Sequence, residues 1–282
     1  MAALVAAALR DAGERPAILS RGYARRRVED GVVVVRDAGG IRADLDRAGD
    51  EPLMLARQLD GVAVLVSGSR HLAGRLAECR LGCTVHVLDD GFQHFDLRRD
   101  ADLVVVAQED LDRPVTLPAG RLREPLDAAA AADAFVLLDA GSQDPAYADP
   151  VAVGRVFRPG VPVWRATRVL PHAPSPDPIL AMAGTAVPAA FFFGLRANGW
   201  NLVEELPFGD HYAYRPHDIA HVVARARAAG ARRIVTTEKD LVRLLPFRPF
   251  PMPIDPIPLT LAIDDRASLV AWLLARMKAA RA

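Results

Sequence analysis

The chain has 282 residues and a formal net charge of zero; 51% of its residues are hydrophobic and 25% are charged. This balance is typical of a globular protein and excludes a disordered one. The zero net charge gives no general attraction to nucleic acid, which is therefore not an expected partner. Only Cys79 and Cys83 occur, so no disulfide framework is indicated and a reducing compartment is expected. No apolar run reaches the roughly 18 to 20 residues that are needed to span a bilayer.

Short apolar runs alternate with helical segments over the first half of the chain. We expect strands at Pro16–Ser20, Val32–Val35, Val62–Ser67, Val85–Leu88, Leu103–Ala107 and Phe135–Asp139, and helices at Ala2–Ala12, Leu53–Leu59 and His71–Arg80. Such alternation predicts βαβ units and a mostly parallel sheet. Right-handed crossovers then place helices on both faces of that sheet. The predicted fold class is therefore α/β.

The amino-acid composition changes around Pro159–Pro178, where the proline-rich stretch P-H-A-P-S-P-D-P is typical of a linker. We expect a boundary here, between a core domain of residues 1–160 and a smaller α/β domain of residues 161–282. In the second domain we expect strands at Ala181–Gly184 and Arg233–Thr236, helices at Phe191–Gly199, Asp218–Ala229 and Ala267–Lys278, and an ordered proline-dense loop at Pro246–Pro258. Phe191–Phe193 is expected in the core rather than against lipid.

Two adjacent carboxylates, Asp89 and Asp90, end the apolar run of V-H-V-L-D-D-G-F-Q at residues 85–93. Burying an unpaired carboxylate costs several kcal/mol, so both are expected at the C-terminal end of the strand. In open α/β sheets this is where ligands bind, and carboxylate oxygens suit a hard cation such as Mg²⁺. The alternative is that an Asp here only caps the next element.

Further polar clusters follow other apparent strand ends. They are Ser20-Arg21, Asp50-Glu51, Arg121-Arg123-Glu124, Asp210-His211 and Glu238-Lys239-Asp240. Carboxylates suit a metal, arginines suit phosphate oxygens and an Asp/His pair suits proton transfer, so the set indicates phosphoryl transfer. Two alternatives stay open. Asp50 and Glu51 would equally favour the N-terminus of a helix, and Arg25–Arg27 fit a solvated loop as well as a phosphate site, whereas Arg21 directly follows a buried strand.

Seven blocks, in this order, resemble the tetraacyldisaccharide 4′-kinase family, the lipid A 4′-kinases of Gram-negative bacteria. They are S-R-G-Y at 20–23, G-D-E-P at 49–52, L-D-D-G-F-Q-H at 88–94, R-D at 99–100, L-P-A-G-x-L-R-E-P at 117–125, D-H-x-x-Y at 210–214 and T-E-K-D at 237–240. The third and fifth blocks are highly specific together, whereas T-E-K-D alone would be weak evidence.

The resemblance implies a P-loop NTPase-like α/β core, a smaller α/β second domain and a cleft between them. It implies ATP and Mg²⁺ as cofactors, and transfer of the ATP γ-phosphate to the 4′-hydroxyl of a tetraacylated glucosamine disaccharide 1-phosphate, the lipid A precursor. It also implies a monomer that is peripheral on the cytoplasmic face of the inner membrane, where Arg25–Arg27 would lie near anionic headgroups.

The resemblance also assigns roles to individual residues. Asp50 and His211 look like the dyad that activates the sugar hydroxyl, and Asp89 looks like the Mg²⁺-binding Walker B carboxylate, supported by Asp90. The substrate- or phosphate-binding residues that it implies are Ser20, Arg21, Tyr23, Gln93, His94, Arg123 and Glu124.

The sequence departs from the family in three places. The family's apolar N-terminal helix and its P-loop, G-G-T-G-K-T-P, would precede Ala2, so this chain is expected to bind ATP poorly as written. The family's G-I-G-N-P stretch is replaced by A-G-T-A-V-P at residues 183–188, and its glycine-rich insert is shortened at Ala107–Thr116.

Two explanations compete for the missing P-loop. In the first, the start codon is assigned too late or the chain is cut short, and the protein is an ordinary kinase. In the second, the chain is a catalytically impaired remnant that binds the lipid disaccharide. We favour the first, because drift after loss of catalysis would have eroded Asp50, Asp89 and His211 as readily as other positions. A third class is a P-loop kinase or GTPase that acts on a small soluble substrate.

Overall fold

The structure is a computed structural model that describes residues 1–23, 25–138, 160–170 and 176–282. By contacts the chain forms two compact units. Unit 1 holds Met1–Pro16, Val87–Val169 and Leu261–Ala282, and unit 2 holds Ala17–His86 and Leu170–Thr260. The division into residues 1–160 and 161–282 stays a prediction. Residues 159 and 171–175 of the expected linker, and Asp139 of the expected strand, lie outside the described residues.

Unit 1 is built on a four-stranded sheet in the order β13-β8-β7-β6. Its strands are β6 (Leu103–Ala107), β7 (Ala134–Leu138), β8 (Val163–Val169) and β13 (Thr260–Ile263). β7 is parallel to both β6 and β8, and all five of its residues are buried. A strand that is covered on both faces reads as a continuous apolar run, which is why A-F-V-L-L could be recognised in the sequence.

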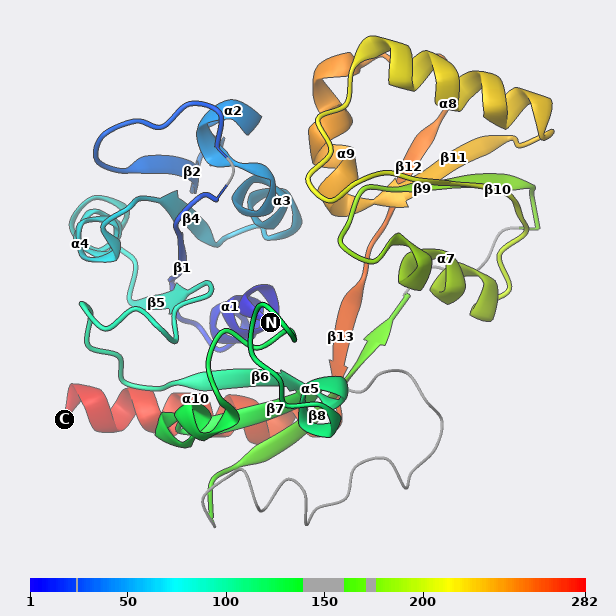
Figure 1. Cartoon of the computed structure of the whole chain (residues 1–282). Coiled ribbons are helices and arrows are strands. Elements are labelled where there is room, and N and C mark those ends of the chain that lie inside the picture. The colour runs from blue at the N-terminus through cyan, green and yellow to red at the C-terminus, as the bar shows by residue number, and fades with distance from the viewer. Residues whose placement is uncertain (24, 139–159, 171–175) are drawn as a thin grey trace. The chain divides into compact units, whose positions relative to one another are not determined.

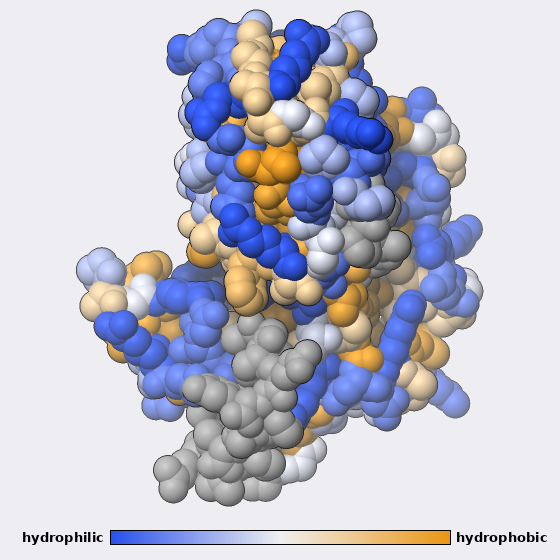
Figure 2. Space-filling view, turned by 90° about the vertical axis from the view of Figure 1, so that its right-hand side faces the viewer, coloured by the Kyte–Doolittle hydropathy of each residue, from blue (hydrophilic) through white to orange (hydrophobic). Residues whose placement is uncertain are grey.

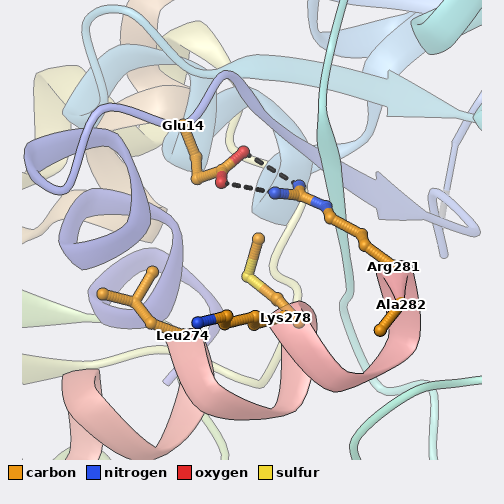
Figure 3. Close-up of a pocket in the computed structure, with 6 residues that line it drawn as sticks. Glu14, Leu274, Lys278, Arg281 and Ala282 are labelled. Atoms are coloured by element: carbon orange, nitrogen blue, oxygen red, sulfur yellow. Dashed lines mark hydrogen bonds and ion pairs between the residues drawn. The ribbon is translucent and has the colours of Figure 1, made fainter.

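The helices of unit 1 include one from each end of the chain. They are α1 (Ala2–Asp11), α5 (Gln108–Asp112), the 3₁₀ helix η1 (Leu126–Ala131) and α10 (Arg266–Arg281). α10 runs alongside the sheet (Figure 1). It contacts the sheet through Trp272, whose ring centroid lies 5.7 Å from that of Trp164. Arg281 at its end donates to both carboxylate oxygens of Glu14, at 2.8 and 3.0 Å (Figure 3). The two ends of the described chain therefore lie in the same unit.

The first segment of unit 2 carries a mixed sheet in the order β3-β2-β4-β1-β5. Its strands are β1 (Pro16–Ser20), β2 (Val33–Asp37), β3 (Gly40–Ile41), β4 (Ala63–Val66) and β5 (Val85–Leu88), with helices α2 (Leu45–Ala48), α3 (Asp50–Gln58) and α4 (Arg70–Leu81). β1 and β4 are parallel and fully buried, whereas β2 is antiparallel to β4.

The second segment of unit 2 carries a parallel sheet in the order β10-β9-β11-β12. Its strands are β9 (Ile179–Ala183), β10 (Leu202–Pro207), β11 (Arg233–Thr237) and β12 (Ile254–Ile257), and its helices are α7 (Pro188–Ala197), α8 (Pro216–Ala228), α9 (Glu238–Leu244) and the 3₁₀ helix η3 (Leu245–Phe247). α7 and α8 lie on opposite faces of this sheet (Figure 1).

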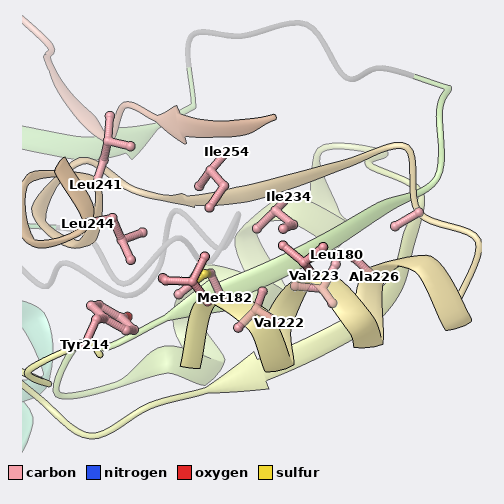
Figure 4. Packing of buried hydrophobic residues seen from close by; sticks show 12 residues of the cluster. Leu180, Met182, Tyr214, Val222, Val223, Ala226, Ile234, Leu241, Leu244 and Ile254 are labelled. Atoms are coloured by element: carbon pink, nitrogen blue, oxygen red, sulfur yellow. The ribbon is translucent and has the colours of Figure 1, made fainter. Parts of the chain in front are cut away.

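Both faces of β9 are buried because each one faces a helix. Leu180 and Met182 point into the core cluster beneath α8 (Figure 4). Ile179, Ala181 and Ala183 belong to the cluster on the other face, beneath α7. Side chains alternate between the two faces of a strand, so one five-residue strand supplies both cores. Because β9 is packed on both faces, the C-terminal ends of β9 and of its neighbour β11 are held in place. Residues of the candidate site directly follow these two strand ends.

The predicted α/β class is confirmed, with parallel strands and helices on both faces. The proline-dense stretch at 246–258 was expected to be a loop, and this is wrong for residues 254–257, which form β12. Pro256 is tolerated there because β12 is an edge strand, where one row of backbone N–H groups needs no partner.

The expectation for Phe191–Phe193 is met only in part. Phe192 is buried in the α7 cluster, whereas Phe193 is 72% exposed. Figure 2 shows the face of the molecule that was on the right of Figure 1; its hydrophobic residues lie in small groups among hydrophilic ones. Within the described residues, no helix has the length and apolar character that crossing a membrane requires.

Candidate active site

Asp50 and His211, from motifs far apart in the sequence, meet in unit 2. Asp50 is the first residue of α3, and His211 lies in the loop between β10 and α8. His211 Nδ1 is 3.0 Å from Asp50 Oδ2. His211 has φ +53°, a left-handed conformation that is uncommon for a residue with a side chain and tends to persist at functional sites. The prediction that these two residues act together therefore has a geometric basis.

The start of α3 is set by Gly49, which has φ +84° at the N-cap position. A Cβ on Gly49 would lie 3.0 Å from the carbonyl oxygen of Tyr23, so the S-R-G-Y loop and the G-D-E-P helix pack backbone to backbone. The ring of Tyr23 lies edge-on to His211, with 5.9 Å between the ring centroids. Tyr23, Asp50 and His211, which the sequence predicted separately, thus form one group.

Asp50 is 6% exposed and accepts three hydrogen bonds. His211 and Arg243 Nε both reach Oδ2 at 3.0 Å, and the backbone N–H of Glu51 reaches Oδ1 at 2.9 Å. An ionised carboxylate only accepts hydrogen bonds, and this arrangement of donors matches that form. Arg243 was not singled out in the sequence. Its only signal was a position four residues after Lys239, on one face of the helix that opens with T-E-K-D.

Lys239 contacts the other ring nitrogen of His211. Its Nζ is 3.2 Å from His211 Nε2 and 3.1 Å from Glu51 Oε1. The sequence placed Lys239 in a polar cluster but gave it no role. α9 therefore supplies one cation to each member of the Asp50–His211 pair.

Asp240 is fully buried and holds Arg243 in place. It accepts from Arg243 Nη1 at 3.2 Å, Tyr214 Oη at 2.9 Å, Thr237 Oγ1 at 2.6 Å and the backbone N–H of Gly184 at 3.0 Å. Burial and the neighbouring Asp240 carboxylate raise the pKa of Tyr214, so the phenol stays a donor. Residues of D-H-x-x-Y, T-E-K-D and A-G-T-A-V-P are thus joined in one network.

A pocket of about 430 Å³ opens beside the Asp50–His211 pair, within unit 2. Its wall combines charge and aromatic surface: Arg26, Asp46, Tyr212 and Phe247 line it together with the pair. A mixed lining of this kind suits a ligand with both polar groups and apolar faces, such as a sugar ring.

A second group follows β5, a strand whose last two residues already belong to unit 1. Asp89 and Asp90 directly follow Leu88, the last residue of the strand, as the sequence predicted. Arg123 Nη1 donates to Asp90 at 2.8 and 3.0 Å and to Gln93 Oε1 at 3.3 Å. The hydrogen bond to Asp90 raises the pKa of Arg123.

Asp90 has φ +50°, and it and His211 are the two non-glycine residues of the described chain with positive φ. Among the described residues there is no group of three or more His, Cys, Asp or Glu side chains that would hold a metal unaided. Asp89 and Asp90 supply oxygen donors of the kind that Mg²⁺ uses, and Mg²⁺ is commonly held by only one or two carboxylates, with water and phosphate completing its shell.

Within the described residues, the remaining predicted site residues make no side-chain hydrogen bond or ion pair with the Asp50–His211 pair or with Asp90. Ser20 is buried and accepts from the backbone N–H of Gly22 at 3.3 Å, and Arg21 beside it is exposed. The His94 side chain is buried, and its carbonyl accepts from Arg99, so it serves the fold of the loop after β5. Glu124 is partly exposed.

Comparisons with known proteins show which family the chain is similar to. Residues 1–278 match the family model for tetraacyldisaccharide-1-P 4′-kinase. The tetraacyldisaccharide 4′-kinase of Rhodopseudomonas palustris (strain TIE-1) is 40% identical, over 98% of this chain and 79% of the relative. The enzyme of the same name from Syntrophus aciditrophicus is 33% identical, over 99% of this chain and 80% of the relative.

A solved structure is also similar. The crystal structure of the "apo" form of LpxK from Aquifex aeolicus in complex with ATP superposes with a TM-score of 0.75 at 28% identity, over 98% of this chain and 82% of that one. The sequence match covers nearly the whole chain and the fold is shared, so this chain belongs to the tetraacyldisaccharide 4′-kinase family.

Proposed function

We propose that this chain is the kinase of lipid A biosynthesis that transfers the γ-phosphate of ATP to the 4′-hydroxyl of a tetraacylated glucosamine disaccharide 1-phosphate. Membership of the family supports the reaction. The observation that carries the proposal for the site is the 3.0 Å contact between Asp50 and His211, because the two motifs lie 161 residues apart and only the fold joins them.

Asp50 is the proposed acceptor of the hydroxyl proton. A carboxylate offers about four acceptor positions, and three of those on Asp50 are taken by Glu51, His211 and Arg243. One position is left for the 4′-hydroxyl. Phosphoryl transfer passes through a loose transition state, so a fixed and oriented acceptor contributes more than a strong base.

The proposed transfer moves one proton and one phosphoryl group. The sugar O–H bond breaks and its proton passes to the Asp50 carboxylate. The sugar oxygen forms a bond to the γ-phosphorus, and the bond from that phosphorus to the β,γ-bridging oxygen breaks. The electron pair of the broken bond leaves on ADP.

Positive charge is needed where the phosphates carry negative charge. Arg123, bonded to Asp90, is the proposed phosphate-facing arginine of unit 1, together with Glu124 and Gln93 as substrate-binding neighbours. Asp89 and Asp90 are the residues that would hold Mg²⁺, and their donor chemistry fits it. Bound Mg²⁺ supplies neutralisation of phosphate charge.

A substitution at Asp50 tests the function directly. Asp50→Ala removes the proton acceptor, and loss of a general base lowers kcat by roughly 10²–10⁴-fold. The measurement is transfer of labelled phosphate from ATP to the tetraacyl disaccharide 1-phosphate. Asp30→Ala, an exposed acidic residue of the same unit, is the matched control and should keep wild-type turnover. Near-normal turnover of Asp50→Ala would remove Asp50 as the acceptor.

The substrate is a lipid, so we propose that the protein works as a monomer that is peripheral on the cytoplasmic face of the inner membrane, with no nucleic acid partner. The loop after β1 supports contact with a lipid surface: Tyr23 is 77% exposed and Val28 is 75% exposed, with Arg25–Arg27 between them. Exposed aromatic and apolar side chains beside arginines are typical of segments that bind anionic headgroups.

Vesicle binding tests this placement. Replacing Arg25–Arg27 by Ser should weaken sedimentation with vesicles that contain anionic lipid and leave binding to neutral vesicles unchanged. A charge-matched control replaces Arg196, Arg225 and Arg232, which are exposed elsewhere in unit 2, by Ser. Equal loss in both triple variants would mean that net charge alone, and not this loop, drives binding.

A further inference from the structure

The Asp50–His211 pair is contacted by two cations of one helix. Lys239 and Arg243 are four residues apart on α9, so both side chains lie on the same side of it. Lys239 Nζ lies 3.2 Å from His211 Nε2, and Arg243 Nε lies 3.0 Å from Asp50 Oδ2. The proposed role of Asp50 as proton acceptor does not by itself explain why Lys239 and Arg243 both contact the pair.

The lysine determines which nitrogen of His211 carries the proton. An ammonium group only donates hydrogen bonds, so Nε2 of His211 must accept from Lys239. The single proton of the neutral ring then sits on Nδ1 and is donated to Asp50 Oδ2. A second proton on Nε2 would face the ammonium donor and add a like charge beside it. Lys239 therefore favours the tautomer with the proton on Nδ1.

Other charged groups face the ring as well. Asp210, on the same loop, has Oδ2 at 3.9 Å from His211 Nε2 and would favour the imidazolium. The Asp210 carboxylate is also 3.9 Å from Lys239 Nζ, so its charge is shared, and the ammonium is the closer group to the ring. The edge of the Tyr23 ring, which is uncharged, also contacts the His211 ring. The nearest charge of all is the Asp50 carboxylate, 3.0 Å from Nδ1, which accepts the Nδ1 proton.

Arg243 is held where it cannot turn away from Asp50. Its Nη1 donates to the carbonyl of Gly184 at 3.0 Å and to Asp240 at 3.2 Å. Its Nη2 is buried and has no partner among the described residues. An unsatisfied buried donor is costly, so stability alone does not account for an arginine at this position. Orientation of Asp50 does.

The choice of lysine at 239 is also informative. Only two of the 35 Lys and Arg residues in the sequence are lysines, Lys239 and Lys278. An ammonium is a compact point charge on a flexible stem, whereas the planar guanidinium presents a wide fork. A compact donor suits the narrow position between His211 and Glu51.

We propose that Lys239 and Arg243 are positioning residues that hold the pair in one hydrogen-bonding arrangement, in which His211 Nε2 accepts from Lys239 and His211 Nδ1 donates to Asp50. Since Nε2 faces Lys239, the proton of the sugar hydroxyl goes to Asp50 and not to His211. This inference rests on the proposed role of the pair, but its first test does not depend on activity.

The first test is nitrogen NMR of the histidine rings in the full chain. Wild type at pH about 6.5 should show His211 with a protonated Nδ1 and an unprotonated Nε2. Lys239→Met removes the donor to Nε2 and should increase the share of rings that carry the proton on Nε2, and Lys278→Met, the only other lysine, should leave the ring signals unchanged. A wild-type ring that is protonated on Nε2 would overturn the inference even if Asp50→Ala is inactive.

The second test is kinetic. Lys239→Met should lower kcat with the KM for ATP unchanged, because the hydrogen bond that orients the His211 ring is lost. Arg243→Lys keeps the charge but not the two-armed geometry, and it should lower kcat by up to about 100-fold, the effect of a misplacement near 1 Å. Thermal unfolding close to wild type shows that the variants fold. A wild-type kcat in both variants would refute the positioning role.

Discussion

At the scale of single residues, the network behind Asp50 depends on the absence of a side chain at residue 184. A Cβ on Gly184 would lie 2.8 Å from Asp240 Oδ1, closer than real Cβ contacts, and 3.0 Å from Tyr214 Oη, tighter than most of them. The backbone N–H and C=O of this residue bind Asp240 and Arg243. The stretch A-G-T-A-V-P thus keeps a glycine where the network requires one.

Gly184→Ala should therefore destabilise the protein, by about 1–3 kcal/mol for overpacking. Gly194, within α7, is the matched control: its Cβ would meet only Leu170 at an ordinary 3.8 Å. Gly194→Ala should stabilise the protein by roughly 0.5–1 kcal/mol, because alanine is the better helix former. Urea unfolding of both variants measures the two free energies. If both substitutions change the unfolding free energy in the same direction, the close packing around Gly184 is contradicted.

The pH dependence of stability should report Tyr214. Its pKa is raised in the folded protein by burial and by Asp240, so folding favours the neutral phenol. The stabilisation is complete below the unfolded value of about 10 and is lost as the pH rises above it, because only the unfolded chain then releases the proton. The unfolding free energy of Tyr214→Phe should fall less steeply above this pH than that of wild type. Tyr23→Phe, at an exposed position, should follow wild type.

At the scale of elements, α9 connects the T-E-K-D motif to the site. The strand before it was predicted, because R-I-V-T-T is short and apolar. Arg243 was not found, because its partner Asp50 lies 193 residues away and a local pattern carries no information about such a contact. β12 was missed for a different reason: prolines mark loops in a sequence, and only its position at the sheet edge makes Pro256 acceptable.

The N-cap of α9 gives a prediction at this scale. Thr237 Oγ1 accepts from the backbone N–H of Asp240 at 3.0 Å and also donates to its carboxylate. Thr237→Val removes both bonds and should cost about 0.5–2 kcal/mol in unfolding free energy together with a clear loss of kcat. Ser69, the N-cap of α4, makes the same kind of bond to Leu72 N–H. Ser69→Ala should cost a similar amount of unfolding free energy and leave kcat unchanged. If Thr237→Val and Ser69→Ala lower kcat equally, the loss reflects lower stability and not the position of Thr237 beside the site.

At the scale of the whole molecule, the chain passes between the two units more than once. Unit 1 takes segments from both ends and from the middle of the sequence. The alternation of strands and helices can be predicted from the sequence, because the pattern that marks each strand or helix lies within a few neighbouring residues. The sequence does not show that α10 returns to pack beside α1, since no composition change marks such a contact.

Two variants of α10 should separate its core from its surface. Leu269 is fully buried, and Leu269→Ala should cost about 2–5 kcal/mol through lost contacts and the cavity left behind. Arg281 pairs with Glu14, but its side chain is 51% exposed, and solvent screens such a pair (Figure 3). Arg281→Ala should therefore cost less than about 1 kcal/mol. Chemical denaturation followed by tryptophan fluorescence, with Trp164 and Trp272 in contact at this interface, measures both. A larger loss in Arg281→Ala than in Leu269→Ala would mean that the ion pair, and not apolar packing, attaches α10 to unit 1.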